Sequence, residues 1–167
     1  MPKQAFNILI FDSGVGGLSI YHALKNASFN TELTQPNQYI YFADHQAAPY
    51  GDKEDLWLNS RIHTLLSSLN KTHSPDLIII ACNTASTLSL DSLRQSISTP
   101  IIGVVPAIKT AALLANEHAE KHIGLLATPA TIQRQYIKDL TEQFAQDLTL
   151  QSIGSTELVT QAENKLS

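Results

Sequence analysis

Six short apolar runs alternate with helix-like segments along the chain. Runs of this kind, dominated by Ile, Leu, Phe and Tyr, predict strands buried in a sheet. The segments between them carry apolar residues at helical spacing, as in the stripe from Leu56 to Leu69, and predict amphipathic helices. The expected strands are 6–11, 39–42, 77–81, 101–105, 123–127 and 148–150.

This alternation of strands and helices implies parallel pairing with right-handed crossovers. We therefore expect an α/β fold, with open parallel sheets flanked by helices. Pro106 is well placed as the first residue of a helix, and a further helix is expected from Thr131 to Phe144. The last segment, 162–167, stops in a helix-like pattern with no closing element, which indicates an incomplete unit.

Composition narrows the class of protein. The 167 residues are 43% hydrophobic and 16% charged, which is typical of a globular protein, and the net charge of −4 gives no electrostatic footprint for nucleic acid. No run reaches the length of a membrane span, and the N-terminal apolar stretch is too short for a signal peptide. Cys82 is the only cysteine, which excludes an internal disulfide and fits a reducing compartment. We expect a soluble, cytoplasmic protein.

Short polar side chains follow most of the expected strands. Ligands of open parallel sheets bind beyond the carboxyl ends of the strands. A polar residue at one strand end is explained by its role as a helix N-cap. A thiol, carboxylates and several hydroxyls at neighbouring strand ends together favour a ligand crevice. The residues are Asp12 and Ser13 after the first strand, Asp44 after the second, Cys82, Asn83 and Thr84 after the third, and Thr128 and Thr131 after the fifth.

Cys82 carries the strongest chemical signal. A thiol at a helix N-terminus faces unpaired N–H groups and the positive end of the helix dipole, which favour the thiolate. The alternative is an inert, buried, apolar side chain. No lysine or arginine lies in the strand-end turns. Backbone N–H groups suit a carboxylate and Asp12 suits an ammonium group, so an amino acid fits the crevice, with Cys82 as general base or nucleophile.

Other motifs are weak. The glycine-rich run 14–17 departs from a dinucleotide-binding fingerprint because position 19 is Ser, and no P-loop lysine is present. His118 and His122 have metal-like spacing, but they span a helix end and a strand start with no third ligand. We therefore expect no metal and no nucleotide cofactor.

Five segments, in this order, resemble the glutamate racemases of the cofactor-independent aspartate/glutamate racemase superfamily. Together they span nearly all of the chain. The segments are 10–18, 41–44 with 49–51, 81–86, 100–109 and 124–131.

The resemblance implies interconversion of L- and D-glutamate without pyridoxal phosphate, which supplies D-glutamate for peptidoglycan. In that family two cysteines face the α-carbon of the substrate from opposite sides. Cys82 matches the cysteine that acts on the D-enantiomer, and Asp12 is placed to support the thiolate or the substrate ammonium group. The residues matching substrate contacts are Asp12, Ser13, Tyr50, Gly51, Asn83, Thr84 and Thr131.

The chain departs from the family at the second cysteine, which belongs to a later Cys-Thr-His motif. Glu163 resembles a glutamate that supports that missing half-site. The resemblance implies two similar flavodoxin-like domains, here 1–99 with the first cysteine and 100–167 as part of the second. We expect the 167 residues alone to be inactive or nearly so.

Two other functions stay open at this stage. One is an aspartate racemase of the same superfamily, because the rim that sets substrate length is not readable from sequence. The other is a non-catalytic module that binds a small acid or a protein partner. Members of the resembling family often pair, so a homodimer is an expectation for the full-length parent.

Overall fold

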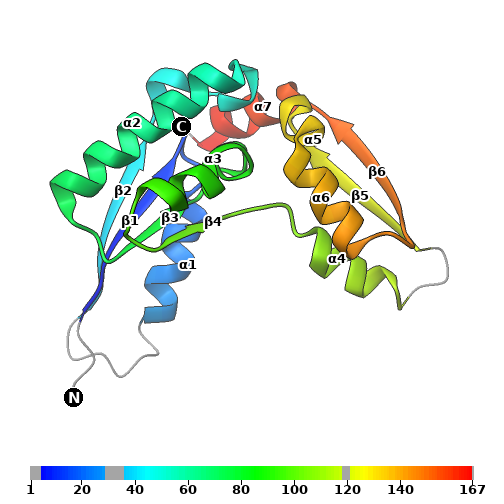
Figure 1. Cartoon of the computed structure of the whole chain (residues 1–167), viewed down its shortest axis with the longest axis horizontal. Coiled ribbons are helices and arrows are strands. Elements are labelled where there is room, and N and C mark those ends of the chain that lie inside the picture. The colour runs from blue at the N-terminus through cyan, green and yellow to red at the C-terminus, as the bar shows by residue number, and fades with distance from the viewer. Residues whose placement is uncertain (1–4, 29–35, 118–120, 167) are drawn as a thin grey trace.

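The structure, a computed structural model, describes residues 5–28, 36–117 and 121–166. Its strands form two separate parallel sheets (Figure 1). A four-stranded sheet has the order β2-β1-β3-β4, and a two-stranded sheet pairs β5 with β6. The predicted α/β class with open parallel sheets is confirmed. The strands are β1 (Asn7–Asp12), β2 (Gln38–Ala43), β3 (Leu77–Ile80), β4 (Ile101–Gly103), β5 (His122–Ala127) and β6 (Thr149–Gly154).

Helices follow each strand, as the sequence pattern predicts. The four-stranded sheet and its helices form the first unit, and the two-stranded sheet with the helices from residue 108 onward forms the second unit. The helices are α1 (Leu18–Ser28), α2 (Asp55–His73), α3 (Asn83–Ser96), α4 (Ile108–Ala115), α5 (Pro129–Gln133), α6 (Gln135–Phe144) and α7 (Thr156–Leu166), with 3-10 turns η1 (His45–Ala47) and η2 (Tyr50–Asp52).

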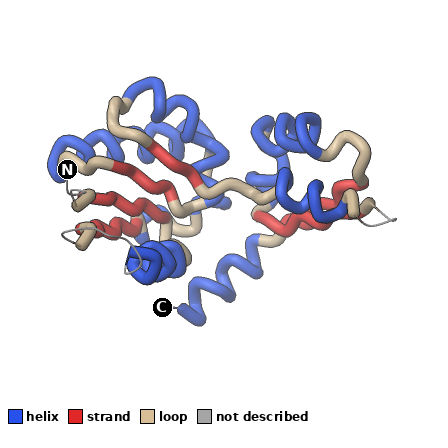
Figure 2. Tube along the Cα trace, turned by 90° about the horizontal axis from the view of Figure 1, so that it is seen from below, coloured by secondary structure: helices blue, strands red, loops and turns tan. Residues whose placement is uncertain are grey.

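Both faces of the first sheet are covered by helices (Figure 2). Alternate residues of a strand point to opposite faces, so Leu9 and Phe11 of β1 pack in the core beside α2 and α3. Ile8 and Ile10 point the other way and pack against α1. This double burial explains why β1 and β3 are continuous apolar runs rather than alternating ones.

The second unit has a smaller core. Buried Ile108 of α4 and Ile137 of α6 pack on the half-buried Ile123 and Leu125 of β5. The side chain of Leu126, which points to the opposite face of the sheet, is 60% exposed. Among the described residues, helices therefore cover one face of this sheet far better than the other.

Strand β4 follows the predicted division of the chain between residues 99 and 100. β4 pairs with β3 in the first sheet, and the Val104 N–H continues the ladder by donating to the Ile80 carbonyl (2.9 Å). Residues 101–103 therefore lie with the first unit, and the crossing to the second unit follows them. The division into two domains itself stays a prediction.

Two helix expectations were wrong in detail. α4 begins at Ile108, not at Pro106, because the chain first turns with the Ile108 N–H donating to the Pro106 carbonyl (2.8 Å). The helix expected from 131 to 144 is broken at Arg134, whose backbone is extended (φ −69°, ψ 144°). Within the described part of the chain, no helix combines the length and the apolar character needed to cross a membrane.

Candidate functional site

The carboxyl ends of β1 and β3 open into a cavity of about 760 Å³, which the loop after β5 also lines. Parallel strands place their carboxyl ends at one edge of the sheet, and this is why polar residues far apart in sequence meet here. The residues that the family resemblance matched to the site all line this cavity: Asp12, Ser13, Tyr50, Gly51, Cys82, Asn83, Thr84 and Thr131. Asp44, which the strand ends also predicted for the crevice, is not among the lining residues.

Cys82 lies at the edge of this cavity as the N-cap of α3, with 8% of its surface exposed. Its Sγ accepts the Ala85 N–H at 3.5 Å and lies 3.5 Å from the Ser13 hydroxyl oxygen. The backbone of Cys82 is extended (φ −85°, ψ 120°), which turns the buried strand β3 into the helix. The thiol therefore points toward the ligand edge of the sheet.

The electrostatic environment corrects the expectation of a thiolate in the free protein. Burial raises the pKa of the Cys82 thiol, and the negative charge of Asp12 raises it further. The Ser13 hydroxyl and the N–H groups of Ala85 and Thr84 lower it, but by less. The sequence indicates the helix N-terminus, whereas the burial of the thiol and its proximity to the Asp12 carboxylate arise only in the folded chain.

Asp12 is held by the loop that follows β1. Its carboxylate accepts the Ser13 N–H at Oδ1 (2.9 Å) and, at Oδ2, the Gly17 N–H (2.7 Å) and the Tyr41 hydroxyl (3.3 Å). A Cβ on Gly17 would lie 2.7 Å from the Ala81 Cβ, so the loop closes this tightly only with glycine. A carboxylate has about four acceptor sites, so Asp12 retains room for one more donor from the cavity.

The Tyr50 hydroxyl is already committed within the protein. It donates to Asp44 Oδ2 (2.8 Å), and Arg61 of α2 binds both oxygens of the same carboxylate (2.6 and 2.7 Å). Arg61 lowers the pKa of Asp44, while burial and Asp44 raise the pKa of Tyr50. Tyr50 therefore offers its ring and backbone to the cavity. Sequence reasoning missed Arg61, because it lies on a helix far from any strand end.

Three threonine hydroxyls join the two units beside the cavity. Thr128 caps α5 and donates to the Thr131 hydroxyl oxygen (2.9 Å), which lies 3.4 Å from the Thr84 hydroxyl oxygen of the first unit. Gly51 touches Thr128 closely, because a Cβ there would lie 2.7 Å from the threonine Cγ2. The second unit thus closes the cavity by direct contact at these positions. Thr128, which the sequence places after the fifth strand, lines the cavity together with Thr131.

Metal binding gains no support within the described part of the chain, where no three His, Cys, Asp or Glu residues cluster as ligands. The predicted pair of His118 and His122 is not testable, because His118 lies outside the described residues. Glu163 lies in α7, but its side chain is also outside the described part.

The lining of the cavity combines groups suited to a zwitterion with a thiol. The first N–H groups of α3, at Asn83 and Thr84, are suited to a carboxylate. Asp12 is suited to an ammonium group, and Cys82 lines the same cavity.

The comparison with known families agrees with this chemistry. Residues 8–165 match the Asp/Glu/Hydantoin racemase family. The chain belongs to this family.

Relatives and solved structures of this racemase family extend the comparison. The glutamate racemase of Vibrio parahaemolyticus is 46% identical over 159 residues, which cover 95% of this chain and 55% of that protein. The structure of Escherichia coli glutamate racemase in complex with L-glutamate and the activator UDP-MurNAc-Ala matches with a TM-score of 0.83 and 39% identity, over 96% of this chain and 57% of that chain. The structure of Francisella tularensis glutamate racemase in complex with D-glutamate matches with a TM-score of 0.75 and 27% identity. This match covers 95% of this chain and 56% of that chain. The chain therefore spans little more than half the length of these racemases.

Proposed function

We propose that this chain is the first-cysteine half of a glutamate racemase, which interconverts L- and D-glutamate by proton transfer at the α-carbon. The observation that supports this most directly is the position of Cys82 Sγ, 3.5 Å from the Ser13 oxygen in a cavity that Asp12 also lines. The relatives named glutamate racemase, at 45 to 47% identity, point to the same reaction.

In the proposed mechanism, the substrate ammonium group binds Asp12 and its α-carboxylate binds the N-terminus of α3. The ammonium charge then offsets the repulsion that Asp12 exerts on a thiolate at Cys82, and the pKa of the thiol falls. The ionised sulfur removes the α-proton of D-glutamate and carries it as a thiol. In the reverse direction the same thiol returns the proton to the same face of the α-carbon.

One cysteine serves only one face of the substrate. Inversion needs a second acid on the opposite face, and the sequence contains no other cysteine. We therefore expect these 167 residues alone to exchange the α-proton of D-glutamate with solvent rather than to invert it. Because the proton returns to the face it left, the product keeps the D configuration.

Proton NMR in D₂O tests this directly. The expected result with D-glutamate is loss of the α-proton signal while chiral chromatography finds no L-glutamate. Cys82→Ser is the matched control and should abolish exchange. Exchange that survives in Cys82→Ser would remove this thiol from the mechanism, and inversion by the 167-residue chain would overturn the one-face assignment.

A non-catalytic binding module is the second candidate, and the raised pKa of the buried Cys82 thiol favours it. Calorimetric titration with D-glutamate and D-aspartate addresses both open alternatives. Binding of D-glutamate without any α-proton exchange would support the module. Stronger binding of D-aspartate, accompanied by exchange, would instead support an aspartate racemase.

Two further proposals concern location and assembly. A lone free cysteine fits the reducing cytoplasm, and we propose that location. A homodimer of the full-length parent stays a prediction, which light scattering during size-exclusion chromatography tests.

A further inference from the structure

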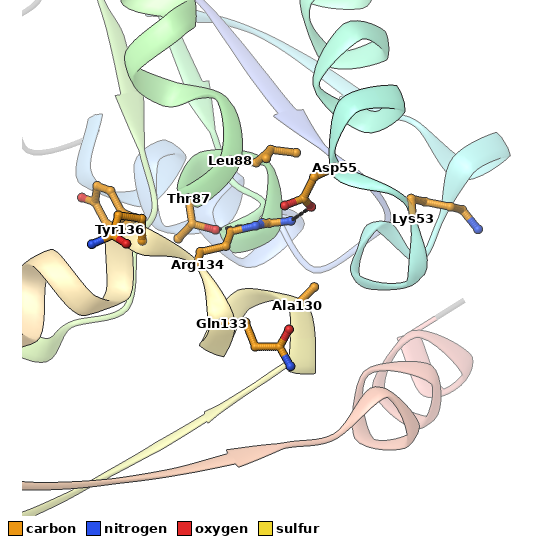
Figure 3. A pocket seen from close by; sticks show the side chains of 9 residues that line it. Lys53, Asp55, Thr87, Leu88, Ala130, Gln133, Arg134 and Tyr136 are labelled. Atoms are coloured by element: carbon orange, nitrogen blue, oxygen red, sulfur yellow. Dashed lines mark hydrogen bonds and ion pairs between the residues drawn. The ribbon is translucent and has the colours of Figure 1, made fainter.

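Arg134 occupies the break between α5 and α6, where the sequence pattern predicts a continuous helix. Its backbone is extended, and its side chain leaves the second unit to reach α2 and α3 of the first (Figure 3). Only 7% of the residue is exposed. Burying a guanidinium in this way is costly unless its charge and hydrogen-bonding groups are engaged.

The guanidinium makes three contacts across the boundary between the units. Nη1 donates to the Thr84 carbonyl (2.6 Å) and to the Thr87 hydroxyl (3.0 Å), and Nη2 donates to Asp55 Oδ1 (2.7 Å). Asp55 is about half exposed, at 52%, so solvent weakens that ion pair. The buried contacts to α3 are therefore the better protected part of the interaction.

These contacts involve the first turn of α3, which follows Cys82 and contributes Thr84 to the cavity. Thr84 lies two residues after Cys82, in the first turn of the helix that Cys82 caps. The Thr131 hydroxyl approaches the side chain of Thr84, while Arg134 binds its carbonyl. The first turn of α3 is thus held at Thr84, whose side chain contacts Thr131 and whose carbonyl accepts from Arg134. Thr131 and Arg134 are three residues apart in the second unit.

Other links also join the two units within the described part of the chain. The chain crosses between the sheets through residues 104–107, which have no regular secondary structure. The contacts of α5 and α6 with α3 and η2 surround Arg134 and the threonines. Removal of the guanidinium eliminates its ion pair and charged hydrogen bonds, and it leaves contacts such as that between the Thr131 and Thr84 hydroxyls and the packing of Gly51 on Thr128.

We propose that Arg134 is a positioning residue, which holds the second unit on the first turn of α3 so that Thr128 and Thr131 close the cavity beside Cys82. The proposal rests on the proposed function for its catalytic meaning. Its structural content, closure of the cavity over the thiol, is independent of any substrate. The positioning role and the proposed function can therefore be disproved separately.

Alkylation of Cys82 by iodoacetamide measures that closure without substrate. Arg134→Met removes the three contacts but retains a long apolar chain. We expect alkylation about tenfold faster, with the inflection of its pH profile at lower pH, because opening relieves the burial that raises the pKa of the thiol. Arg134→Lys keeps the charge and one donor direction and should give an intermediate rate.

Two controls separate positioning from general loss of stability. Asp55→Asn breaks the ion pair and leaves the contacts to Thr84 and Thr87, so its effect should be much smaller. Gln133→Ala changes an exposed neighbour and should leave the rate unchanged. Low urea concentrations distinguish global unfolding, which accelerates alkylation steeply with urea, from local opening, which does not.

The outcomes decide the proposal. Faster alkylation in Arg134→Met, with little urea dependence and a lowered pH inflection, supports it. A wild-type alkylation rate and pH profile in Arg134→Met would overturn it. An equal effect of Asp55→Asn would also overturn it, because the contact that holds the second unit would then lie at α2 instead of α3. If the wild-type chain neither binds nor exchanges D-glutamate while Arg134→Met still opens the cavity, the proposed function fails and the positioning role stands.

Discussion

The two units of this chain differ in how firmly they hold the residues they bring to the cavity. In the first unit, helices cover both faces of the sheet, and Leu9, Ile10 and Phe11 of β1 are fully buried. In the second unit, Leu126 and Ile153 on the exposed side of the sheet are 60% and 57% exposed. The thiol and the carboxylate thus belong to the more deeply buried unit, whereas the closing hydroxyls depend on a few polar contacts.

Truncation of one core side chain in each unit should give the largest contrast. Ile80→Ala, at a fully buried position of β3, should lower the free energy of unfolding by about 2–5 kcal/mol. Ile123→Ala in the half-buried β5 should cost clearly less, because part of that side chain already contacts water. Urea denaturation of both variants measures the difference. Equal losses would contradict the idea that the second unit is the weaker one.

Gly17→Ala should be the next largest change. The added Cβ would lie 2.7 Å from the Ala81 Cβ, so the loop over Asp12 must shift. We expect a loss of about 1–3 kcal/mol in the free energy of unfolding, as in other overpacked sites, together with weaker binding of D-glutamate. The control is Gly124→Ala in the second unit, where an added Cβ meets nothing within 4 Å. Similar costs at both positions would argue against a tight loop.

Asp12→Asn should act on the thiol more than on stability. Removal of the negative charge eliminates one cause of the raised pKa of Cys82, so the thiolate fraction near neutral pH should rise, by about three- to tenfold. The alkylation rate of the free chain reports this fraction. An unchanged or slower rate would show that burial alone sets the pKa.

Asp44→Asn should alter the dependence of stability on pH. Arg61 holds the pKa of Asp44 below its ordinary value. The pair therefore stabilises the fold above the unfolded-state pKa of about 4, and this contribution disappears as the pH falls through the lower folded-state value. We expect the variant to lose about 1–2 kcal/mol of the free energy of unfolding near neutral pH. In thermal unfolding its Tm should fall less steeply as the pH is lowered, which gives a flatter acid limb. An acid limb as steep as that of the wild type would contradict this assignment.

Leu126→Ser should have the smallest effect. The side chain is 60% exposed, and exposed substitutions usually change stability by no more than about 0.5 kcal/mol. Differential scanning calorimetry would detect any larger loss. A loss of several kilocalories per mole would mean that this face of the second sheet is covered in solution.

The sequence was informative where short-range rules decide the outcome. Strand ends in a parallel sheet converge by geometry, so Asp12, Cys82 and Thr131 could be placed together although they come from three strand ends. Five ordered segments also identified the family. In both cases the information lies in consecutive residues or in the regular alternation of strands and helices.

Long-range contacts account for what the sequence did not reveal. Arg134 breaks an amphipathic pattern to reach Thr84, a residue 50 positions earlier, and no local signal marks such a contact. Arg61 likewise acts on Asp44 across η1 and η2. The raised pKa of Cys82 depends on burial and on the distance to Asp12, which are properties of the folded chain alone.

The protonated state of Cys82 has a consequence for the survival of the protein under oxidative stress. Peroxides attack thiolates far faster than thiols, and the first product leads on to irreversible acids. In the proposed mechanism the sulfur ionises mainly when an ammonium group lies beside Asp12, so it would offer oxidants little to attack while the cavity is free of ligand. The arrangement that delays ionisation thus also shields the sole cysteine of the chain from damage.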